Sequence, residues 1–179
     1  MPTIDTPRLM LIPATAEALR AELVGREALA AVLDIDVPGS WPPDLYDADA
    51  VRWTLSALEE GRAPGGWRFY YIVERPAPDA RPRLCGGGGF VGAPDVTGTV
   101  EIGYSIVPER RRRGYARETV DAWIAWAFGH AEVTRVIAHT LRDLTPSIRL
   151  LESAGFSYVG PHAAAGEPDA IQYERRRPA

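Results

Sequence analysis

The chain has 179 residues, the length of one ordinary domain, and its formal net charge is −4. All 20 of its lysine-plus-arginine positions are arginine, and the sequence contains neither lysine nor asparagine. The absence of lysine excludes a Walker A phosphate loop and enzymes that form a Schiff base on a lysine amine. The acidic balance argues against a general nucleic-acid binder, which usually carries a basic excess.

The bulk composition, 46% hydrophobic and 25% charged residues, is that of a globular protein with a buried core. Cys85 is the single cysteine and the three histidines share no metal-ligand spacing, so we expect neither disulfides nor a metal site. No apolar run approaches the length of a membrane span, and the N-terminus lacks a signal-peptide pattern. We therefore expect one cytoplasmic domain over residues 1–179, with no membrane or nucleic-acid partner.

Periodicity, capping residues and turn residues predict strands that alternate with helices. In chain order the predicted elements are a strand at 6–13, helices at 16–33 and 47–60, strands at 67–74, 84–91 and 99–107, a helix at 114–129, a strand at 135–140, a helix at 146–154, and strands at 156–159 and 170–175. Thr15 and Thr145 are the expected N-caps of the first and last helices. The alternation implies a mixed α/β sheet in one domain.

The segment from Val100 to Arg117 carries the strongest chemical signal in the sequence. A predicted strand ends, four consecutive arginines follow at 110–113, and Gly114 opens an amphipathic helix. The first N–H groups of a helix have no internal partner, and the helix dipole adds positive potential there. Glycine lets the backbone approach a ligand closely, and arginine makes bidentate contacts to phosphate. The pattern favours a diphosphate site, and a solvated basic turn that caps a helix is the alternative.

This turn resembles the acyl-CoA signature of the GNAT acetyltransferase superfamily. The signature is Gln/Arg-X-X-Gly-X-Gly/Ala after a strand, and here it reads Arg111-Arg112-Arg113-Gly114-Tyr115-Ala116. The opening Thr6-Pro-Arg-Leu-Met-Leu and the late Ser147-Ile-Arg-Leu-Leu-Glu-Ser-Ala-Gly-Phe156 are similar to motifs of the RimJ/RimL-like branch. Together the three motifs extend the resemblance over nearly the whole chain.

The resemblance implies a GNAT fold, with a central twisted mixed sheet of six to seven strands flanked by about four helices. It implies that an acetyl group moves from acetyl-CoA to a primary amine by direct attack in a ternary complex. The pantetheine arm of acetyl-CoA would pair with residues 104–107, and a backbone N–H near Ile106 or Val107 would stabilise the oxyanion. The cofactor-binding residues implied are Ile106, Val107, Arg111, Arg112, Arg113, Gly114, Tyr115 and Ala116.

Glu101 is the candidate base, because it heads the strand that would carry the pantetheine, and the superfamily often has a glutamate there. A surface carboxylate paired with an arginine is the alternative, and His139 is a weaker base candidate. A base matters more for a lysine side chain, with a pKa of about 10.4, than for a peptide α-amine at about 8. Ser147 is the candidate acid for the departing thiolate, unless its hydroxyl only bonds the start of the last helix.

Leu144 departs from the RimJ/RimL-like pattern, which commonly has asparagine three residues before the serine. The departure favours an alternative function, a non-catalytic acyl-CoA-binding sensor or interaction module. Trp41 lies in the loop that covers the acceptor site in related proteins, where it is either a stacking surface for the acceptor or a core anchor. The acceptor is left open between a protein N-terminal α-amine and a small-molecule amine, and the resemblance also allows a homodimer.

Overall fold

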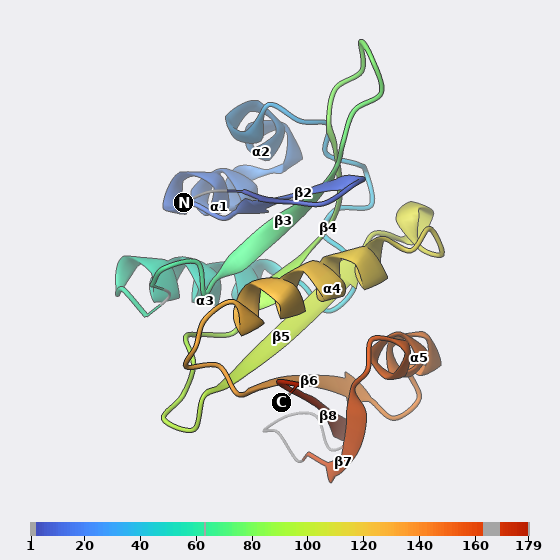
Figure 1. Cartoon of the computed structure of the whole chain (residues 1–179). Helices are drawn as coiled ribbons and strands as arrows, with labels where there is room; N and C mark the ends of the chain where they lie inside the picture. The colour runs from blue at the N-terminus through green and yellow to red at the C-terminus, as the bar shows by residue number, and fades with distance from the viewer. Residues whose placement is uncertain (1–2, 63, 163–168, 179) are drawn as a thin grey trace.

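The structure is a computed structural model that describes residues 3–62, 64–162 and 169–178, and this part of the chain forms one mixed sheet with helices on both faces (Figure 1). Its strands are β1 (Ile4–Asp5), β2 (Leu9–Pro13), β3 (Phe69–Glu74), β4 (Arg83–Phe90), β5 (Thr99–Ile106), β6 (Arg135–Leu141), β7 (Ser157–Pro161) and β8 (Ala170–Arg176). Its helices are α1 (Ala16–Val24), α2 (Arg26–Leu33), α3 (Ala48–Glu59), α4 (Tyr115–Phe128) and α5 (Thr145–Ser153), with a short 3₁₀ turn at Pro108–Arg110.

The sheet has the order β1-β2-β3-β4-β5-β6-β8-β7, and all neighbours are antiparallel except β5 and β6. The parallel pairing of β5 with β6 ends at Ile102 and Ala138. By contrast, β5 stays paired with β4 as far as Ile106. The end of β5 therefore has a strand neighbour on one side only, and its other side opens toward the starts of α4 and α5.

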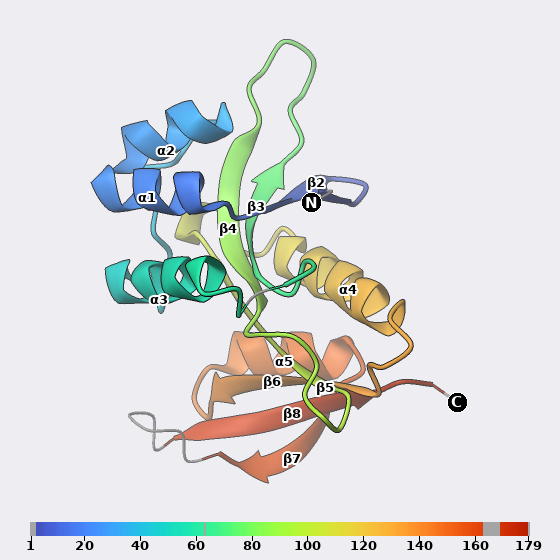
Figure 2. The same ribbon diagram turned by 90° about the vertical axis from the view of Figure 1, so that its left-hand side faces the viewer.

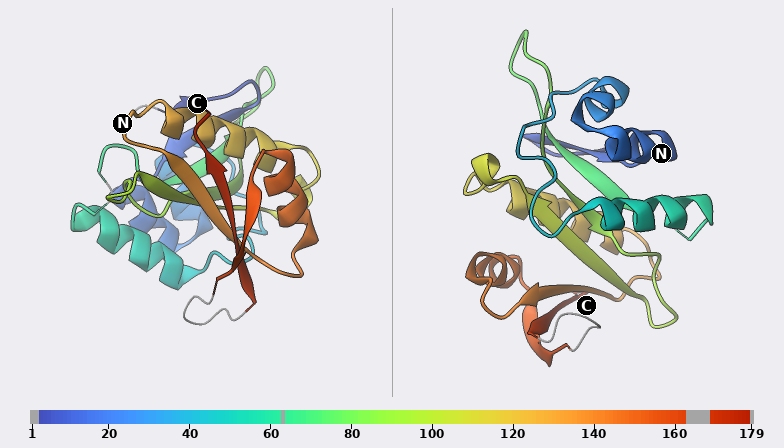
Figure 3. Two further views of the ribbon diagram at one scale, coloured as in Figure 1. Left: turned by 60° about the horizontal axis from the view of Figure 1, so that its bottom comes forward. Right: turned by 180° about the vertical axis from the view of Figure 1, so that it is seen from behind.

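Helices cover both faces of this sheet (Figures 2 and 3). On one face, α1, α2 and α3 pack around Tyr71 and Val73 of β3. On the other face, α4 and α5 pack around Tyr70 and Ile72, with Trp123 of α4 fully buried. These four residues are consecutive in β3, and they face opposite sides of the sheet in turn because the side chains of a strand alternate between its two faces.

The predicted mixed α/β fold is confirmed, with one strand and one helix more than expected among the described residues. The added strand, β1, has only two residues, which is too short to leave a periodic pattern, and it pairs with Met10 and Leu11 of β2. The predicted helix at 16–33 is divided into α1 and α2 at Gly25, whose φ of 153° suits glycine. The glycine within the predicted helix therefore marks the point where the helix is interrupted.

Of the two predicted N-caps, only Thr15 serves as one. Its hydroxyl accepts a hydrogen bond from the Ala18 N–H at 3.1 Å. Thr145 is instead the first residue of α5, and Leu144 holds the N-cap position without a side-chain hydrogen bond. The prediction for Thr145 was wrong because Pro146 marks the start of a helix only to within a residue or two.

Candidate functional site

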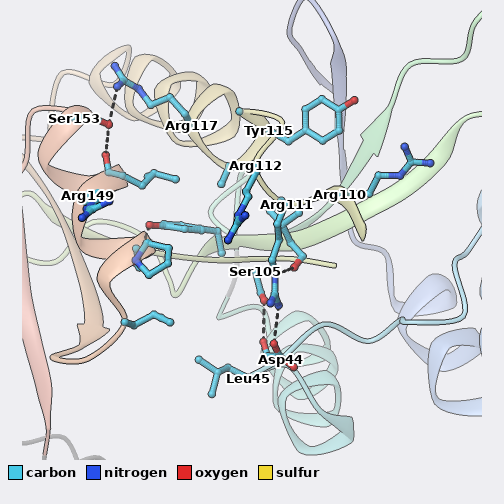
Figure 4. Close-up of a pocket in the computed structure, with 18 residues that line it drawn as sticks. Asp44, Leu45, Ser105, Arg110, Arg111, Arg112, Tyr115, Arg117, Arg149 and Ser153 are labelled. Atoms are coloured by element: carbon cyan, nitrogen blue, oxygen red, sulfur yellow. Dashed lines mark hydrogen bonds and ion pairs between the residues drawn. The ribbon is translucent and has the colours of Figure 1, made fainter. Parts of the chain in front are cut away.

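A cavity of about 670 Å³ lies where the open side of β5 meets the starts of α4 and α5 (Figure 4). We call it the α4–α5 cavity. Arg117 of α4 donates a hydrogen bond to Ser153 of α5 at 3.0 Å, which joins the two helices beside it. The lining of the α4–α5 cavity includes seven residues predicted from the sequence: Ile106, Arg111, Arg112, Gly114, Tyr115, Ala116 and Ser147. Two other predicted residues, Val107 and Arg113, do not line it.

Backbone direction at the end of β5 distinguishes the two predicted oxyanion donors. The Val107 N–H donates to the Cys85 carbonyl at 3.0 Å, so it points toward β4, and Val107 is fully buried. Backbone groups of successive strand residues point to opposite sides in the plane of the sheet. The N–H groups of Tyr104 and Ile106 therefore point away from β4, toward the opening between β5 and β6.

The four consecutive arginines have different partners. Arg110 pairs with Glu74 at 3.3 Å, and Arg111 pairs with Asp44 at 2.6 Å. Arg113 accepts a hydrogen bond at its carbonyl from Arg8 at 2.9 Å. Arg112 lines the cavity and forms no ion pair or side-chain hydrogen bond with the described residues, and Figure 4 shows it extending into the space beside β5.

Arg149 adds a second cationic side chain to this cavity from the first turns of α5 (Figure 4). It is exposed and, within the described ranges, has no carboxylate partner. The sequence prediction missed it, although it lies only two residues after Ser147. Its position in that motif was the available signal.

The start of α4 supplies backbone donors to the same cavity. Gly114 is the N-cap residue with φ 80°, and it has no side chain with which to cap the helix. The first turn of hydrogen bonds begins with the Glu118 N–H, which donates to the Gly114 carbonyl at 3.0 Å. The N–H groups of Tyr115, Ala116 and Arg117 therefore lack helical partners, an arrangement that binds anions well.

Ser147 forms a hydroxyl pair with Tyr104. Their side-chain oxygens lie 3.1 Å apart, and both residues line the α4–α5 cavity. Burial raises the pKa of Tyr104 to about 12, against the lowering effect of the bond to Ser147. Tyr104 was predicted only as a member of the buried face of its strand. A buried hydroxyl needs a partner, and that need was the signal of a polar role.

A second cavity, of about 440 Å³, lies between α3 and the glycine-rich part of β4. We call it the α3 cavity. It shares three lining residues with the α4–α5 cavity, namely Leu45, Tyr104 and Ser105. The two cavities therefore meet at the end of β5, where Tyr104 lines both.

His139 lines the α3 cavity and is held by Glu101. Its Nδ1 lies 2.8 Å from the Glu101 carboxylate, and its Nε2 lies 3.3 Å from the Gln172 side-chain oxygen. The ring of His162 stacks on the ring of His139, with 3.8 Å between the ring centroids. Glu101 itself is not a lining residue, and among the described residues its side-chain hydrogen-bond partner is this histidine rather than an arginine. The two base candidates thus form one pair.

Trp41 lies in the core, in agreement with the core-anchor alternative and not with an exposed stacking surface. It is 5% exposed and lines neither cavity. Its indole N–H donates to Glu22 at 2.7 Å, and its ring lies 5.7 Å from that of Tyr46, which does line the α3 cavity. Trp41 therefore lies behind the lining of the α3 cavity, next to Tyr46.

Leu144 lines the α4–α5 cavity and is 38% exposed. Its hydrocarbon side chain offers no hydrogen bond at the position where the RimJ/RimL-like branch commonly has asparagine.

In the described part of the chain, no group of three or more His, Cys, Asp or Glu is arranged to hold a metal ion. No described helix is long and apolar enough to cross a membrane.

The sequence matches the acetyltransferase (GNAT) domain family over residues 8–157. The uncharacterized N-acetyltransferase YjdG of Bacillus subtilis (strain 168) is 30% identical over 125 residues, which cover 69% of this chain and 71% of that protein. The uncharacterized N-acetyltransferase YoaA of the same strain is 37% identical over 60 residues, 34% of each chain. The predicted resemblance is therefore confirmed at the level of sequence.

Solved structures share the fold. A Bordetella pertussis protein assigned to the GnaT acetyltransferase family has a TM-score of 0.70 at 21% identity, covering 98% of this chain and 99% of that one. RimL, a ribosomal L7/L12 α-N-protein acetyltransferase solved with coenzyme A, has a TM-score of 0.65 at 16% identity and 98% coverage of both chains. At 16% identity, the likeness to RimL shows a shared fold. The chain belongs to the GNAT acetyltransferase family and is an acetyl-CoA-dependent acetyltransferase.

Proposed function

We propose that the chain transfers the acetyl group of acetyl-CoA to a primary amine. The observation that carries this proposal is the meeting of two cavities at Tyr104, one with free cations at a helix N-terminus and one with the Glu101–His139 pair. The α4–α5 cavity would hold acetyl-CoA and the α3 cavity would hold the amine. The reacting atoms would then meet at the end of β5.

The residues of the α4–α5 cavity fit acetyl-CoA. Its phosphates would bind the free N–H groups at the start of α4, together with the side chains of Arg112 and Arg149. Its pantetheine arm would lie along the open side of β5, where the backbone groups of Tyr104 and Ile106 lack a strand partner. RimL has been solved with coenzyme A, and MccE, a microcin C7 self-immunity acetyltransferase, with acetyl-CoA and AMP, and both structures share this fold.

The Glu101–His139 pair would act as the base. The amine must be neutral to attack, and one proton must leave its nitrogen as the new C–N bond forms. His139 lines the cavity of the amine, and Glu101 orients the ring through the contact at Nδ1. Nε2 would be the atom that takes the proton, for which the Gln172 side-chain oxygen, 3.3 Å away, has to give way to the amine. Glu101 would therefore act on the amine through His139, whereas the sequence left open whether Glu101 acts directly or through a water.

The end of β5 would stabilise both charges that develop as the C–S bond breaks. The Ile106 N–H, which points into the opening, would donate to the thioester oxygen. Of the bonded hydroxyls of Tyr104 and Ser147, one would donate a hydrogen bond to the departing thiolate while it accepts one from the other. Burial raises the pKa of Tyr104 to about 12, so its hydroxyl is protonated at neutral pH. Acetyl-CoA supplies the activated acyl group, and these residues supply orientation and proton transfer.

A non-catalytic acyl-CoA-binding module is the second candidate function. Leu144 favours it, because a hydrocarbon side chain lines the cavity where asparagine is common in the branch. Titration calorimetry and thiol release with a panel of primary amines distinguish the two. We expect acetyl-CoA to bind at about micromolar concentration and amines to release CoA thiol. Binding without thiol release would favour the module, and no binding up to about millimolar would contradict both.

A further inference from the structure

We propose that the acceptor is a small monoamine with a compact apolar body, and not a polyamine or a lysine-rich peptide. This inference rests on the proposed function and adds the chemical class of its acceptor. It follows from the charge, the rim and the size of the α3 cavity. Each of these features points to a ligand that presents one ammonium group and otherwise apolar surface.

The charge of the α3 cavity disfavours a second cation. Among the described residues that line it, none is Asp or Glu, and Arg68 carries the only permanent charge. Most of the lining is aromatic or aliphatic, with Phe69 and Phe90 on neighbouring strands. An ammonium group in apolar surroundings without a carboxylate partner loses hydration that nothing replaces. A second cationic group on the acceptor would therefore be costly.

Two carboxylates behind the lining of the α3 cavity cannot serve as additional ammonium sites. Glu22 lies behind Tyr46, where it accepts hydrogen bonds from Trp41, Tyr46 and Tyr71. Burial raises its pKa, which disfavours the charged form. Glu101 lies behind His139 and is bonded to it. The cavity therefore offers one place for an amine nitrogen, beside His139, and no second one.

The rim of the α3 cavity is apolar and exposed. Leu45 is 76% exposed, Trp53 is 50% exposed and Val91 is 49% exposed, and all three line the cavity. Single exposed apolar side chains are ordinary, but three around one opening form a surface that gains from contact with an apolar ligand. The volume of about 440 Å³ is within the range of small-molecule sites.

Two probes of equal chain length test the inference, n-hexylamine and 1,6-diaminohexane. They differ in that one end of the chain carries either a methyl group or a second ammonium group. Binding of each is measured by calorimetry on protein saturated with CoA, where no acetyl transfer can occur. We expect n-hexylamine to bind at least about tenfold more tightly. Equal or tighter binding of the diamine, or no binding of either probe at about millimolar concentration, would overturn the proposal.

A charge substitution at the rim tests the cause of the preference. Val91→Glu places a carboxylate at the cavity opening, and we expect it to reduce the preference for n-hexylamine at least about threefold. Val96→Glu is the matched control: Val96 is fully exposed and lines neither cavity, so the wild-type preference should persist. An unchanged preference in Val91→Glu, or an equal change in both variants, would contradict the electrostatic argument.

Turnover separates this inference from the proposed function. If n-hexylamine binds preferentially but acetyl-CoA and n-hexylamine release no CoA thiol, the proposed function fails while the class of ligand stands. If both amines are acetylated with equal kcat/KM, the proposed function stands and the inference fails. Preferential binding together with preferential acetylation of n-hexylamine supports both.

Discussion

Arg111 Nη2 lies 2.6 Å from the Asp44 carboxylate, which ties the loop before α3 to the turn before α4 (Figure 4). Two further hydrogen bonds complete this connection. Arg111 Nε donates to the Ile106 carbonyl at 2.9 Å, and the Ser105 hydroxyl donates to the Asp44 carbonyl at 2.9 Å. The loop is thereby held against the end of β5, with Leu45 at the junction of both cavities.

Asp44→Ala should weaken substrate binding without unfolding the protein. The pair is largely exposed, with side-chain exposures of 44% and 72%, so its loss should change the free energy of unfolding by less than about 1 kcal/mol. Because Leu45 borders both cavities, we expect the KM values for acetyl-CoA and for the amine to rise about three- to fivefold. Steady-state kinetics and urea unfolding measure the two effects.

Asp49→Ala is the control for this prediction. Asp49 forms a comparable exposed ion pair with Arg52 at 2.6 Å and lines neither cavity. Its removal should leave both KM values unchanged. Equal KM values in the wild type and in Asp44→Ala would show that the loop needs no tether.

Arg112→Gln and Arg149→Gln should each weaken acetyl-CoA binding. Both side chains line the α4–α5 cavity without a carboxylate partner among the described residues. A charge-assisted hydrogen bond to phosphate contributes about 1.5–3 kcal/mol, so we expect the Kd for acetyl-CoA to rise about 10- to 100-fold in each variant. Calorimetry at low and high salt should also show a weaker salt dependence than in the wild type.

Arg81→Gln is a suitable control, since Arg81 is exposed, pairs with Asp34 at 2.6 Å and lines neither cavity. It should bind acetyl-CoA as the wild type does. Arg113→Gln tests the original sequence prediction, because its side chain is outside the lining; we expect less than about a threefold effect. A loss in Arg113→Gln as large as in Arg112→Gln would contradict the assignment of the cavity.

Glu101→Gln and His139→Gln should each lower kcat about a hundredfold, because the pair takes the proton of the amine as one unit. Residues that act as a unit are not additive, so the double variant should lose little more than either single variant. Thiol release with saturating acetyl-CoA measures kcat, and calorimetry should show unchanged acetyl-CoA binding.

Glu27→Gln controls for the removal of one negative charge, since Glu27 is exposed on α2 and lines neither cavity. Its kcat should equal that of the wild type. Multiplicative losses in the double variant would indicate that Glu101 and His139 act separately. Robust turnover by Glu101→Gln would show that Glu101 takes no part in removing the proton of the amine.

The phosphate-binding part of the site could be predicted because its residues are contiguous. A strand end at Ile106, a turn and the helix start at Tyr115 follow one another, and five of the six residues 111–116 line the α4–α5 cavity. Local rules of helix ends are sufficient there. The sequence could not separate the roles of the four arginines, because Arg110 and Arg111 pair with Glu74 and Asp44, which are distant in sequence.

The base pair depended on strand register, which only the folded sheet determines. The pairing of β5 with β6 aligns Glu101 with Ile137. His139 is two residues farther along β6, so its side chain lies on the same face as that of Ile137. The burial of Trp41 likewise depends on a distant partner, Glu22 of α1. A proline-rich loop has no periodicity from which to infer which way an indole points. These contacts could not be derived from local patterns.

Glu22→Gln should change how stability depends on pH. Burial raises the pKa of Glu22 above its ordinary value of 4.5, despite the hydrogen bonds from Tyr71, Trp41 and Tyr46 that lower it. A group whose pKa is raised on folding stabilises the fold below its unfolded pKa, and this stabilisation is lost as the pH rises through the folded pKa. Glutamine keeps an acceptor oxygen and has no proton to lose.

We therefore expect the free energy of unfolding of Glu22→Gln, relative to the wild type, to become more favourable between about pH 5 and about pH 8. Urea unfolding at both pH values measures this difference. Glu17→Gln, an exposed carboxylate on the same helix, should show a difference that does not vary with pH. If Glu22→Gln and the wild type kept a constant difference, the carboxyl would not titrate within that range. The cluster around Trp41 would then act as a packing site alone.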